Sequence, residues 1–151
     1  MIDILNLQRK ITIDLDEFRK FSRQLIESVA ETDGRPFAVA FVSDRRMKAL
    51  NETFRGKSTT TDVLSFPNQP EDFELNASST STDGNEQSSL GDIVISAEQA
   101  QKQAEENGLT FDAEIKQLIL HGLLHLCGYD HETDDGEMNA RELELREEAG
   151  I

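Results

Sequence analysis

All three histidines of the chain lie within eleven consecutive residues, HGLLHLCGYDH, at positions 121–131. His121 and His125 are four residues apart, so on a helix their side chains lie on the same face, one turn apart. Gly128 allows the chain to leave that helix in a left-handed conformation, which brings His131 back toward the same face. Three neutral imidazoles in this arrangement can bind a metal ion and leave its fourth position open, as in catalytic zinc sites.

A structural role for the histidines competes with this interpretation. A histidine on an apolar helix is usually a hydrogen-bonded core residue, and for two at this spacing both interpretations remain open. A third histidine six residues later, with a glycine between, favours the metal site. The spacing is similar to the metzincin signature His-Glu-x-x-His-x-x-Gly-x-x-His. However, Gly122 occupies the position of the glutamate that serves those proteases as general base, so the pattern argues against peptide hydrolysis.

The only cysteine, Cys127, follows His125 by two residues and therefore points to a different side of the predicted helix. We expect it to be a small buried residue and not a fourth ligand. A lone cysteine cannot form an intrachain disulfide, which suits a reducing cytoplasm. The chain has no long apolar run and no signal-peptide pattern at its start, so we expect a soluble cytoplasmic protein without a membrane segment.

The formal net charge of −15 argues against a general nucleic-acid binder, because phosphate contacts require lysine and arginine. The charge is unevenly distributed. Residues 130–148 contain nine acidic and two basic side chains, whereas residues 44–57 contain five basic and two acidic ones. The basic segment is equally compatible with local binding of a polyanion and with a solvated helix face.

Hydrophobic periodicity predicts strands at residues 2–5, 37–42, 63–66 and 91–95, the third of them ended by Pro67. It predicts helices at residues 15–29, 44–51, 97–107, 111–127 and 135–148. Asp14, Ser96 and Thr110 are suitable N-cap residues. The helix that carries His121 and His125 is apolar on nearly every side, which predicts a central, buried position.

The order of these elements predicts an α+β domain with a small four-stranded mixed sheet and about five helices, one of them a metzincin-like zinc-binding helix. At 151 residues, we expect the whole chain to form one domain. Residues 68–89 are rich in Asn, Ser, Thr, Asp, Glu and Gly. We expect a mobile polar loop there, and not a domain linker, because both flanks are predicted core strands.

Three segments together resemble the YbeY family of bacterial endoribonucleases and rRNA maturation factors. They are HGLLHLCGYDH at residues 121–131, NETFRGK at 51–57 followed by TDVLSFP at 61–67, and LGDIVI at 90–95. Their order and the total length fit the whole chain. The histidine segment is the most specific of the three, because glycine replaces the protease glutamate. The polar stretch at 68–89 departs from the pattern, but it places no metal ligand in doubt.

The resemblance implies a zinc-dependent, single-strand-preferring endoribonuclease that acts in 16S rRNA 3′-end maturation and ribosome quality control. It implies one zinc ion bound by His121, His125 and His131, with Arg55 and His121 as the candidate catalytic residues. The implied partners are single-stranded RNA, 16S rRNA, and the small ribosomal subunit with its proteins. An alternative is a zinc-binding ribosome-assembly factor with little intrinsic catalysis, which the strong acidity and the missing base favour.

Arg55 would contribute a planar, permanently charged guanidinium suited to binding phosphate, although a surface ion pair is the simpler role for it. No obvious general base lies beside the first histidine. Asp62, Asp92 and Asp130 are candidates for hydrogen bonding to an imidazole N–H, and each also has a structural interpretation at a strand start or in a turn. The nucleophile is left open at this point.

Overall fold

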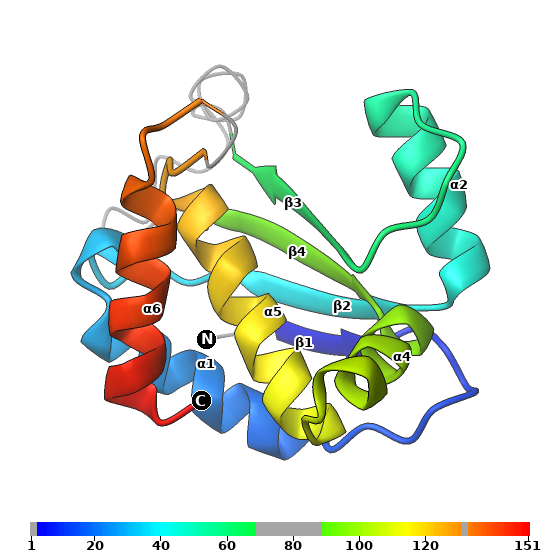
Figure 1. The fold of residues 1–151 in the computed structure, drawn as a ribbon, viewed down its shortest axis with the longest axis horizontal. Helices are drawn as coiled ribbons and strands as arrows, with labels where there is room; N and C mark the ends of the chain where they lie inside the picture. The colour runs from blue at the N-terminus through cyan, green and yellow to red at the C-terminus, as the bar shows by residue number, and fades with distance from the viewer. Residues whose placement is uncertain (1–2, 69–88, 131–132) are drawn as a thin grey trace, which may run out of the picture.

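A four-stranded mixed sheet forms the centre of the computed structural model, which describes residues 3–68, 89–130 and 133–151 (Figure 1). Its strands are β1 (Asp3–Asn6), β2 (Ala38–Val42), β3 (Val63–Pro67) and β4 (Gly91–Ser96), in the order β1-β2-β4-β3. The first three strands in this order are parallel, and β3 is antiparallel to β4. The predicted α+β fold with a four-stranded mixed sheet is confirmed. The expected polar loop falls almost wholly outside the described residues.

Five α-helices surround the sheet in the described part of the chain. They are α1 (Leu15–Ser28), α2 (Asp44–Arg55), α4 (Ala97–Asn107), α5 (Phe111–Leu126) and α6 (Glu137–Ala149), with a 3-10 turn η1 (Ala30–Thr32) after α1. The predicted N-caps Asp14, Ser96 and Thr110 each accept a hydrogen bond from the backbone N–H three residues later. Helix α2 continues four residues beyond its expected end, because Gly56, at φ 69°, is the residue that ends it.

The two faces of the sheet pack against different helices. Side chains alternate along each strand, so Ile93 and Ile95 lie on one face and Val94 on the other. The first face packs in the main core beneath α1, α5 and α6. On the opposite face, Leu64 and Val94 pack with Met47 of α2 in a smaller cluster. Strand β3, at the sheet's edge, therefore lies between α5 and α2, as Figure 1 shows.

Helix α5 approaches the sheet closely at Gly122. A Cβ added to this glycine would lie 2.8 Å from Cγ2 of Ile93 in β4, closer than side-chain carbons normally approach. The Ser65 hydroxyl of β3 also donates a hydrogen bond to the Gly122 carbonyl, at 3.3 Å. Glycine at this position therefore has a packing function, because it sets the depth of α5, which is buried along most of its length as expected.

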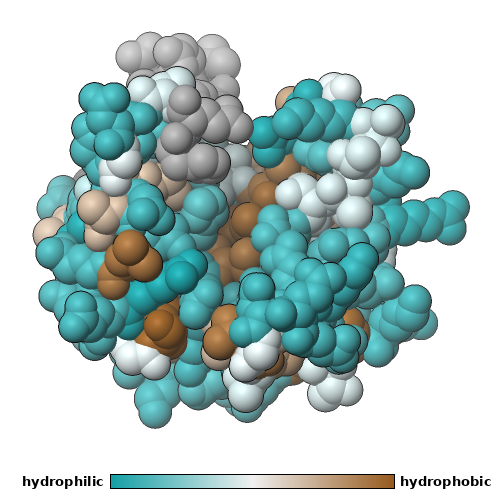
Figure 2. Space-filling model, in the orientation of Figure 1, coloured by the Kyte–Doolittle hydropathy of each residue, from teal (hydrophilic) through white to brown (hydrophobic). Residues whose placement is uncertain are grey.

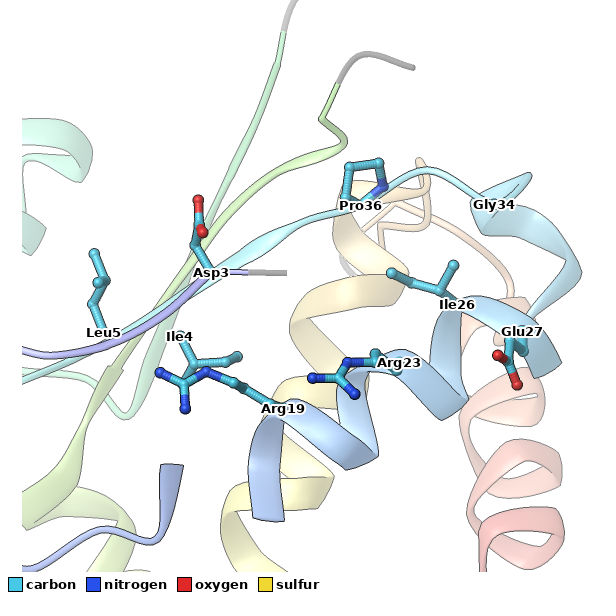
Figure 3. Close-up of a pocket in the computed structure, with 9 residues that line it drawn as sticks. All are labelled: Asp3, Ile4, Leu5, Arg19, Arg23, Ile26, Glu27, Gly34 and Pro36. Carbon is cyan, nitrogen blue, oxygen red and sulfur yellow. The ribbon is translucent and has the colours of Figure 1, made fainter. Parts of the chain in front are cut away.

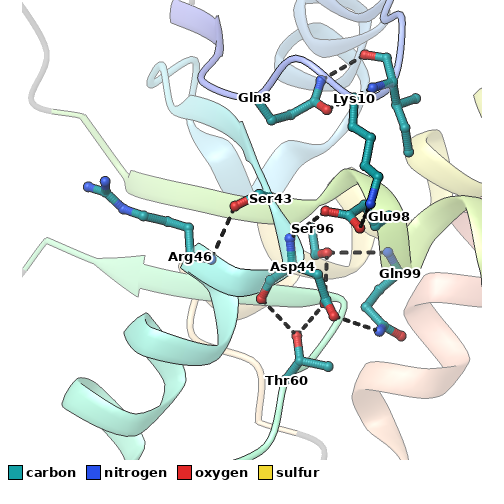
Figure 4. A network of polar contacts seen from close by, with 10 residues as sticks. Gln8, Lys10, Ser43, Asp44, Arg46, Thr60, Ser96, Glu98 and Gln99 are labelled. Atoms are coloured by element: carbon teal, nitrogen blue, oxygen red, sulfur yellow. Dashed lines mark hydrogen bonds and ion pairs between the residues drawn. The ribbon is translucent and has the colours of Figure 1, made fainter.

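A polar network anchors the first turn of α2 (Figure 4). Asp44 Oδ1 accepts hydrogen bonds from the hydroxyls of Thr60, at 2.5 Å, and Ser96, at 3.1 Å. Its Oδ2 accepts one from Gln99 Nε2, and its backbone N–H donates to Glu98. These contacts connect the start of α2 with the start of α4 and with the loop that leads from α2 to β3. The network thus fixes where α2 leaves the sheet.

We predict that Gly122→Ala destabilises the protein. In an exposed helix this change is stabilising by about 1 kcal/mol. Here, the added methyl meets Ile93, and displacing packed atoms costs about 1–3 kcal/mol. Since the gain offsets part of this cost, thermal unfolding followed by circular dichroism should show a melting temperature lower by up to about 8 °C.

The control variants are the single variant Ile93→Ala and the double variant Ile93→Ala/Gly122→Ala. Because Ile93→Ala removes the atoms that the new methyl meets, the double variant should be more stable than the sum of the two single losses. Strict additivity of the two losses would contradict the proposed contact.

Candidate metal centre

His121 and His125 lie side by side on the partly exposed side of α5. Their ring centroids are 4.9 Å apart, and the rings are inclined by 78°. The residues before each of them, Leu120 and Leu124, are fully buried in the core. The spacing of four residues therefore places both imidazoles on one face, as the sequence predicts, while the remaining sides of α5 are buried.

Glu142 of α6 orients the first imidazole. Its Oε1 lies 2.7 Å from His121 Nδ1, and the residue is only 7% exposed. Burial by itself would raise the pKa of Glu142, but the hydrogen bond from His121 and the nearby Arg146 guanidinium outweigh burial and hold that pKa below its usual value. An ionised carboxylate accepts the proton on Nδ1, so Nε2 is the nitrogen through which His121 would bind a metal.

The backbone after α5 orients the second imidazole. His125 Nδ1 lies 3.0 Å from the carbonyl oxygen of Tyr129. A carbonyl can only accept a hydrogen bond, so Nδ1 of His125 carries the proton and Nε2 carries the lone pair that a metal ion needs. Gly128, at φ 104°, makes the turn that returns the Tyr129 carbonyl to the helix.

The donor set fits a zinc site of the kind expected. Both imidazoles have Nδ1 engaged by an acceptor, which is the usual arrangement behind a metal-binding Nε2. Within residues 3–68, 89–130 and 133–151, no group of three His, Cys, Asp or Glu side chains is arranged to hold an ion. The predicted third ligand, His131, lies outside the described residues.

A second set of contacts holds the turn that carries the Tyr129 carbonyl. The Tyr129 hydroxyl donates to Glu31 Oε2 at 2.7 Å. Arg141 of α6 donates to both oxygens of the same carboxylate, at 2.8 and 2.9 Å. The hydrogen bonds from Arg141 and Tyr129 outweigh partial burial and lower the pKa of Glu31 from 4.5 to about 2. The turn after α5, η1 and α6 are therefore locked together beside His125.

A cleft of about 810 Å³ runs along the edge strand β3, with α5 on one side and the end of α2 on the other. Phe54, Arg55, Phe66, His121 and His125 are among the residues that line it. Figure 2 shows a hollow on this face, with hydrophobic side chains at its bottom and hydrophilic ones around it. The structure therefore brings Arg55 and two of the three predicted metal ligands to one cavity.

Arg55 is the last residue of α2 and is exposed. A cation in the last turn also interacts favourably with the negative end of the helix dipole. This position differs from the sequence prediction, which ends the helix at about Asn51, before Arg55. Because α2 continues to Arg55, the guanidinium is carried into the cleft by a helix, on the opposite face of the sheet from α5.

The hydrogen-bond partners of the two Nδ1 atoms were not among the sequence candidates. The sequence suggests Asp62, Asp92 and Asp130 for this role. In the structure, Glu142 and the backbone of Tyr129 fill it for His121 and His125. Asp62 and Asp130 do line the cleft.

One signal in the sequence could have identified Glu142. It lies four residues after Met138 and three before Leu145, so on a helix it shares their face. Met138 and Leu145 are both buried. A carboxylate on the apolar stripe of a helix requires a buried partner, and His121 is that partner here.

Cys127 packs against the core at the end of α5 and is half-buried. Burial is the main reason why the pKa of its thiol rises to about 11. Both observations suit the expected small apolar residue.

A different cavity, of about 620 Å³, lies between β1 and α1 (Figure 3). Arg19 and Arg23 of α1 line it together with residues of β1. It contains none of the predicted site residues, and β1 is the opposite edge of the sheet from β3. The cleft at β3 is therefore the candidate functional site.

The fold and the site define an α+β domain whose central helix presents paired, oriented histidines to a cleft at the sheet's edge. The family model described as Endoribonuclease YbeY matches residues 3–150, and the chain belongs to this family. Among curated proteins, the Endoribonuclease YbeY of Nitratiruptor sp. is 42% identical over 130 residues, covering 85% of this chain and 81% of the relative. That of Bacillus cereus is 38% identical over 143 residues, covering 90% and 89%.

A solved structure has the same fold. The solution structure of TM1509 from Thermotoga maritima matches with a TM-score of 0.63 and 30% sequence identity. The match covers 98% of this chain and 88% of that one. In the described part of the chain, none of the helices has the length and hydrophobicity needed to span a membrane.

We predict that Glu31→Gln destabilises the protein in a pH-dependent way. The folded-state pKa of Glu31 is about 2, below its usual 4.5, so the stabilisation is complete above about pH 5 and is lost as the pH falls toward 2. Hydrogen bonds to charged groups contribute about 1.5–3 kcal/mol, so urea unfolding at pH 7 should show a loss of roughly that size.

The difference in unfolding free energy between the two proteins should shrink between pH 4.5 and pH 2. Glu144→Gln is a matched control, because Glu144 also pairs with Arg141 but does not contact Tyr129 and is more exposed. An equal loss in the two variants, or a Glu31→Gln loss independent of pH, would contradict the assigned role.

Proposed function

We propose that this protein is a zinc-dependent endoribonuclease that cleaves single-stranded RNA at the β3 cleft. The proposal rests on one observation. Nδ1 of His121 and Nδ1 of His125 are each hydrogen-bonded to an acceptor, and both histidines line the same cleft as Arg55. The names of the family and of its curated relatives support RNA as the substrate and hydrolysis as the reaction.

Zinc bound at this site would act as a Lewis acid on a phosphoryl oxygen and would lower the pKa of water to about 7. His121, His125 and His131 would hold it. Glu142 and the Tyr129 carbonyl keep the first two imidazoles in the correct tautomer and orientation. Arg55, from the other side of the cleft, would bind the non-bridging phosphate oxygens through its planar guanidinium and stabilise negative charge that develops during the reaction.

From the family resemblance we propose a cellular role in 16S rRNA 3′-end maturation and ribosome quality control. The proposed partners are the small ribosomal subunit and its proteins, and the proposed location is the cytoplasm. The basic segment at residues 44–57, which includes α2, offers a local surface for RNA on an otherwise acidic chain.

We predict that the purified protein contains one zinc ion per chain, and that a His121→Ala/His125→Ala double variant loses both zinc and RNA cleavage. Elemental analysis and cleavage of a labelled single-stranded RNA are the two measurements. Cys127→Ser is the control and should keep its zinc, because Cys127 packs against the core.

Full zinc occupancy in the double variant would disprove the ligand assignment. Zinc-loaded wild-type protein that binds RNA but does not cleave it would favour the assembly-factor alternative.

We predict that Arg55→Glu reduces RNA cleavage at least about a hundredfold, the scale for loss of one preorganised transition-state donor. Zinc content and melting temperature should change little, because Arg55 is exposed at the end of α2. Arg55→Lys should recover only part of the rate, since an ammonium group cannot bind two phosphate oxygens as a planar fork.

Lys102→Glu is the matched control for the charge reversal. Lys102 is also an exposed basic residue on a helix, α4, but it lies outside the basic segment and does not line the cleft, so its replacement should leave cleavage close to wild type. Equal rates for Arg55→Glu and wild type would show that Arg55 is only a surface charge, and loss of zinc or of the fold would show a structural role.

A further inference from the structure

We propose that Phe54 is a stacking platform for an unpaired nucleobase of the RNA strand in the β3 cleft. This inference rests on the proposed function and adds the residue that selects single strands. It starts from an unusual exposure: Phe54 is 62% exposed, although it is a large apolar side chain. Such a residue in a ligand-sized cleft is a candidate for direct contact with the ligand.

The position of Phe54 on α2 explains why it is exposed. Met47, Leu50 and Phe54 follow helical spacing and share the face of α2 that packs on the sheet. Met47 is fully buried, and Leu50 packs against the same small cluster. At the last turn, Phe54 contacts Phe66 of the edge strand β3 and lines the cleft, so Phe54 continues the apolar stripe beyond the cluster.

Phe66 of β3 holds the ring in place. The centroids of Phe54 and Phe66 are 5.2 Å apart, and the planes meet at 72°, an edge-to-face contact. Such a contact orients the Phe54 ring and covers at most one of its two faces. A fixed aromatic ring with an open face, in a cleft, is the arrangement on which proteins stack single-stranded bases.

Arg55 offers a phosphate contact beside Phe54. A metal ion held by the histidines would offset the charge of Asp62 and Asp130, which also line the cleft. Arg55, next in sequence, lines the same cleft, and Lys57 follows two residues later. A strand whose phosphate lies at Arg55 and the two histidines would bring the base of a neighbouring nucleotide to Phe54. Bases in a duplex are already stacked and paired, so they cannot lie flat on this ring, and the platform therefore discriminates against double-stranded RNA.

The experiment measures binding and stacking independently of cleavage. The probe is a short single-stranded oligonucleotide of 2′-O-methyl ribonucleotides with an end-attached fluorophore, and a second copy carries 2-aminopurine at successive positions. Fluorescence anisotropy gives the dissociation constant, and quenching of 2-aminopurine reports base stacking. The variants are Phe54→Leu, which keeps an apolar contact with Phe66 but has no π face, and Phe54→Trp, which keeps the face.

We expect Phe54→Leu to weaken single-strand binding by about fivefold to a hundredfold and to abolish quenching at the position that stacks. Phe54→Trp should bind at least as tightly as wild type. Binding of the corresponding duplex should be the same in all variants. An abasic nucleotide at the stacking position should weaken wild-type binding but have no further effect in Phe54→Leu.

Leu7→Ala is the matched control, because Leu7 is also 62% exposed but follows β1, at the opposite edge of the sheet. The inference would be overturned if Phe54→Leu bound single strands as tightly as Leu7→Ala does. It would also be overturned if the wild-type protein bound no RNA. If the wild-type protein cleaves RNA and Phe54→Leu binds RNA as tightly as wild type, the stacking platform is refuted but the proposed nuclease is not. Phe54-dependent binding without any cleavage by wild type would instead refute the proposed nuclease and keep the platform.

Discussion

His121 and His125 lie on a helix whose other residues are mostly core, and each imidazole needs a hydrogen-bond acceptor. This requirement determines the structure on this side of the molecule. Helix α5 buries its apolar residues against the sheet and presents His121 and His125 at its remaining side. A buried polar group without a hydrogen-bond partner destabilises the fold, because the same group can bond to water in the unfolded chain. The chain meets this demand from two directions, with a carboxylate from α6 and with the backbone of the turn after α5.

Helix α6 serves the site twice through neighbouring residues. Glu142 reaches His121 directly, and Arg141 reaches Glu31, whose carboxylate also holds the Tyr129 side chain. The docking of α6 is thereby coupled to the orientation of both histidines. Among the acidic side chains of the C-terminal segment, Glu142 is buried and paired with His121 and Arg146, whereas most of the other described ones are exposed.

Local patterns in the sequence were sufficient for most of the fold and for part of the site. Short apolar runs identified the four strands, and cap residues such as Asp14 and Thr110 located helix starts, because these signals act over a few residues. The histidine spacing placed His121 and His125 on one face for the same reason. The end of α2 was missed, since Gly56 is a helix stop that is easily read as part of a loop.

Local patterns mark Glu142 as a carboxylate on an apolar stripe, but they do not show which residue it pairs with, and they give no sign of the acceptor for His125. Glu142 lies 21 residues from His121 along the chain. The acceptor for His125 is the backbone carbonyl of Tyr129, a group that every residue type has. Phe54 lies beyond the predicted end of the helix at residue 51, and only the structure shows that it is helical, exposed and in the cleft. These relations depend on how elements pack, and packing is the level at which one sequence read alone is least informative.

The Asp44 network has a mechanical consequence for the cleft. It fixes α2 at its first turn, and the helix then extends about 18 Å to Arg55, at about 1.5 Å per residue. Such a helix acts as a lever, so a tilt of only about 5° at the anchor displaces the far end by about 1.5 Å. Reacting groups tolerate misplacement of about 1 Å poorly. The stiffness of a few hydrogen bonds far from the histidines therefore contributes, together with the packing of α2 on the sheet, to the width of the cleft where phosphate and base would lie.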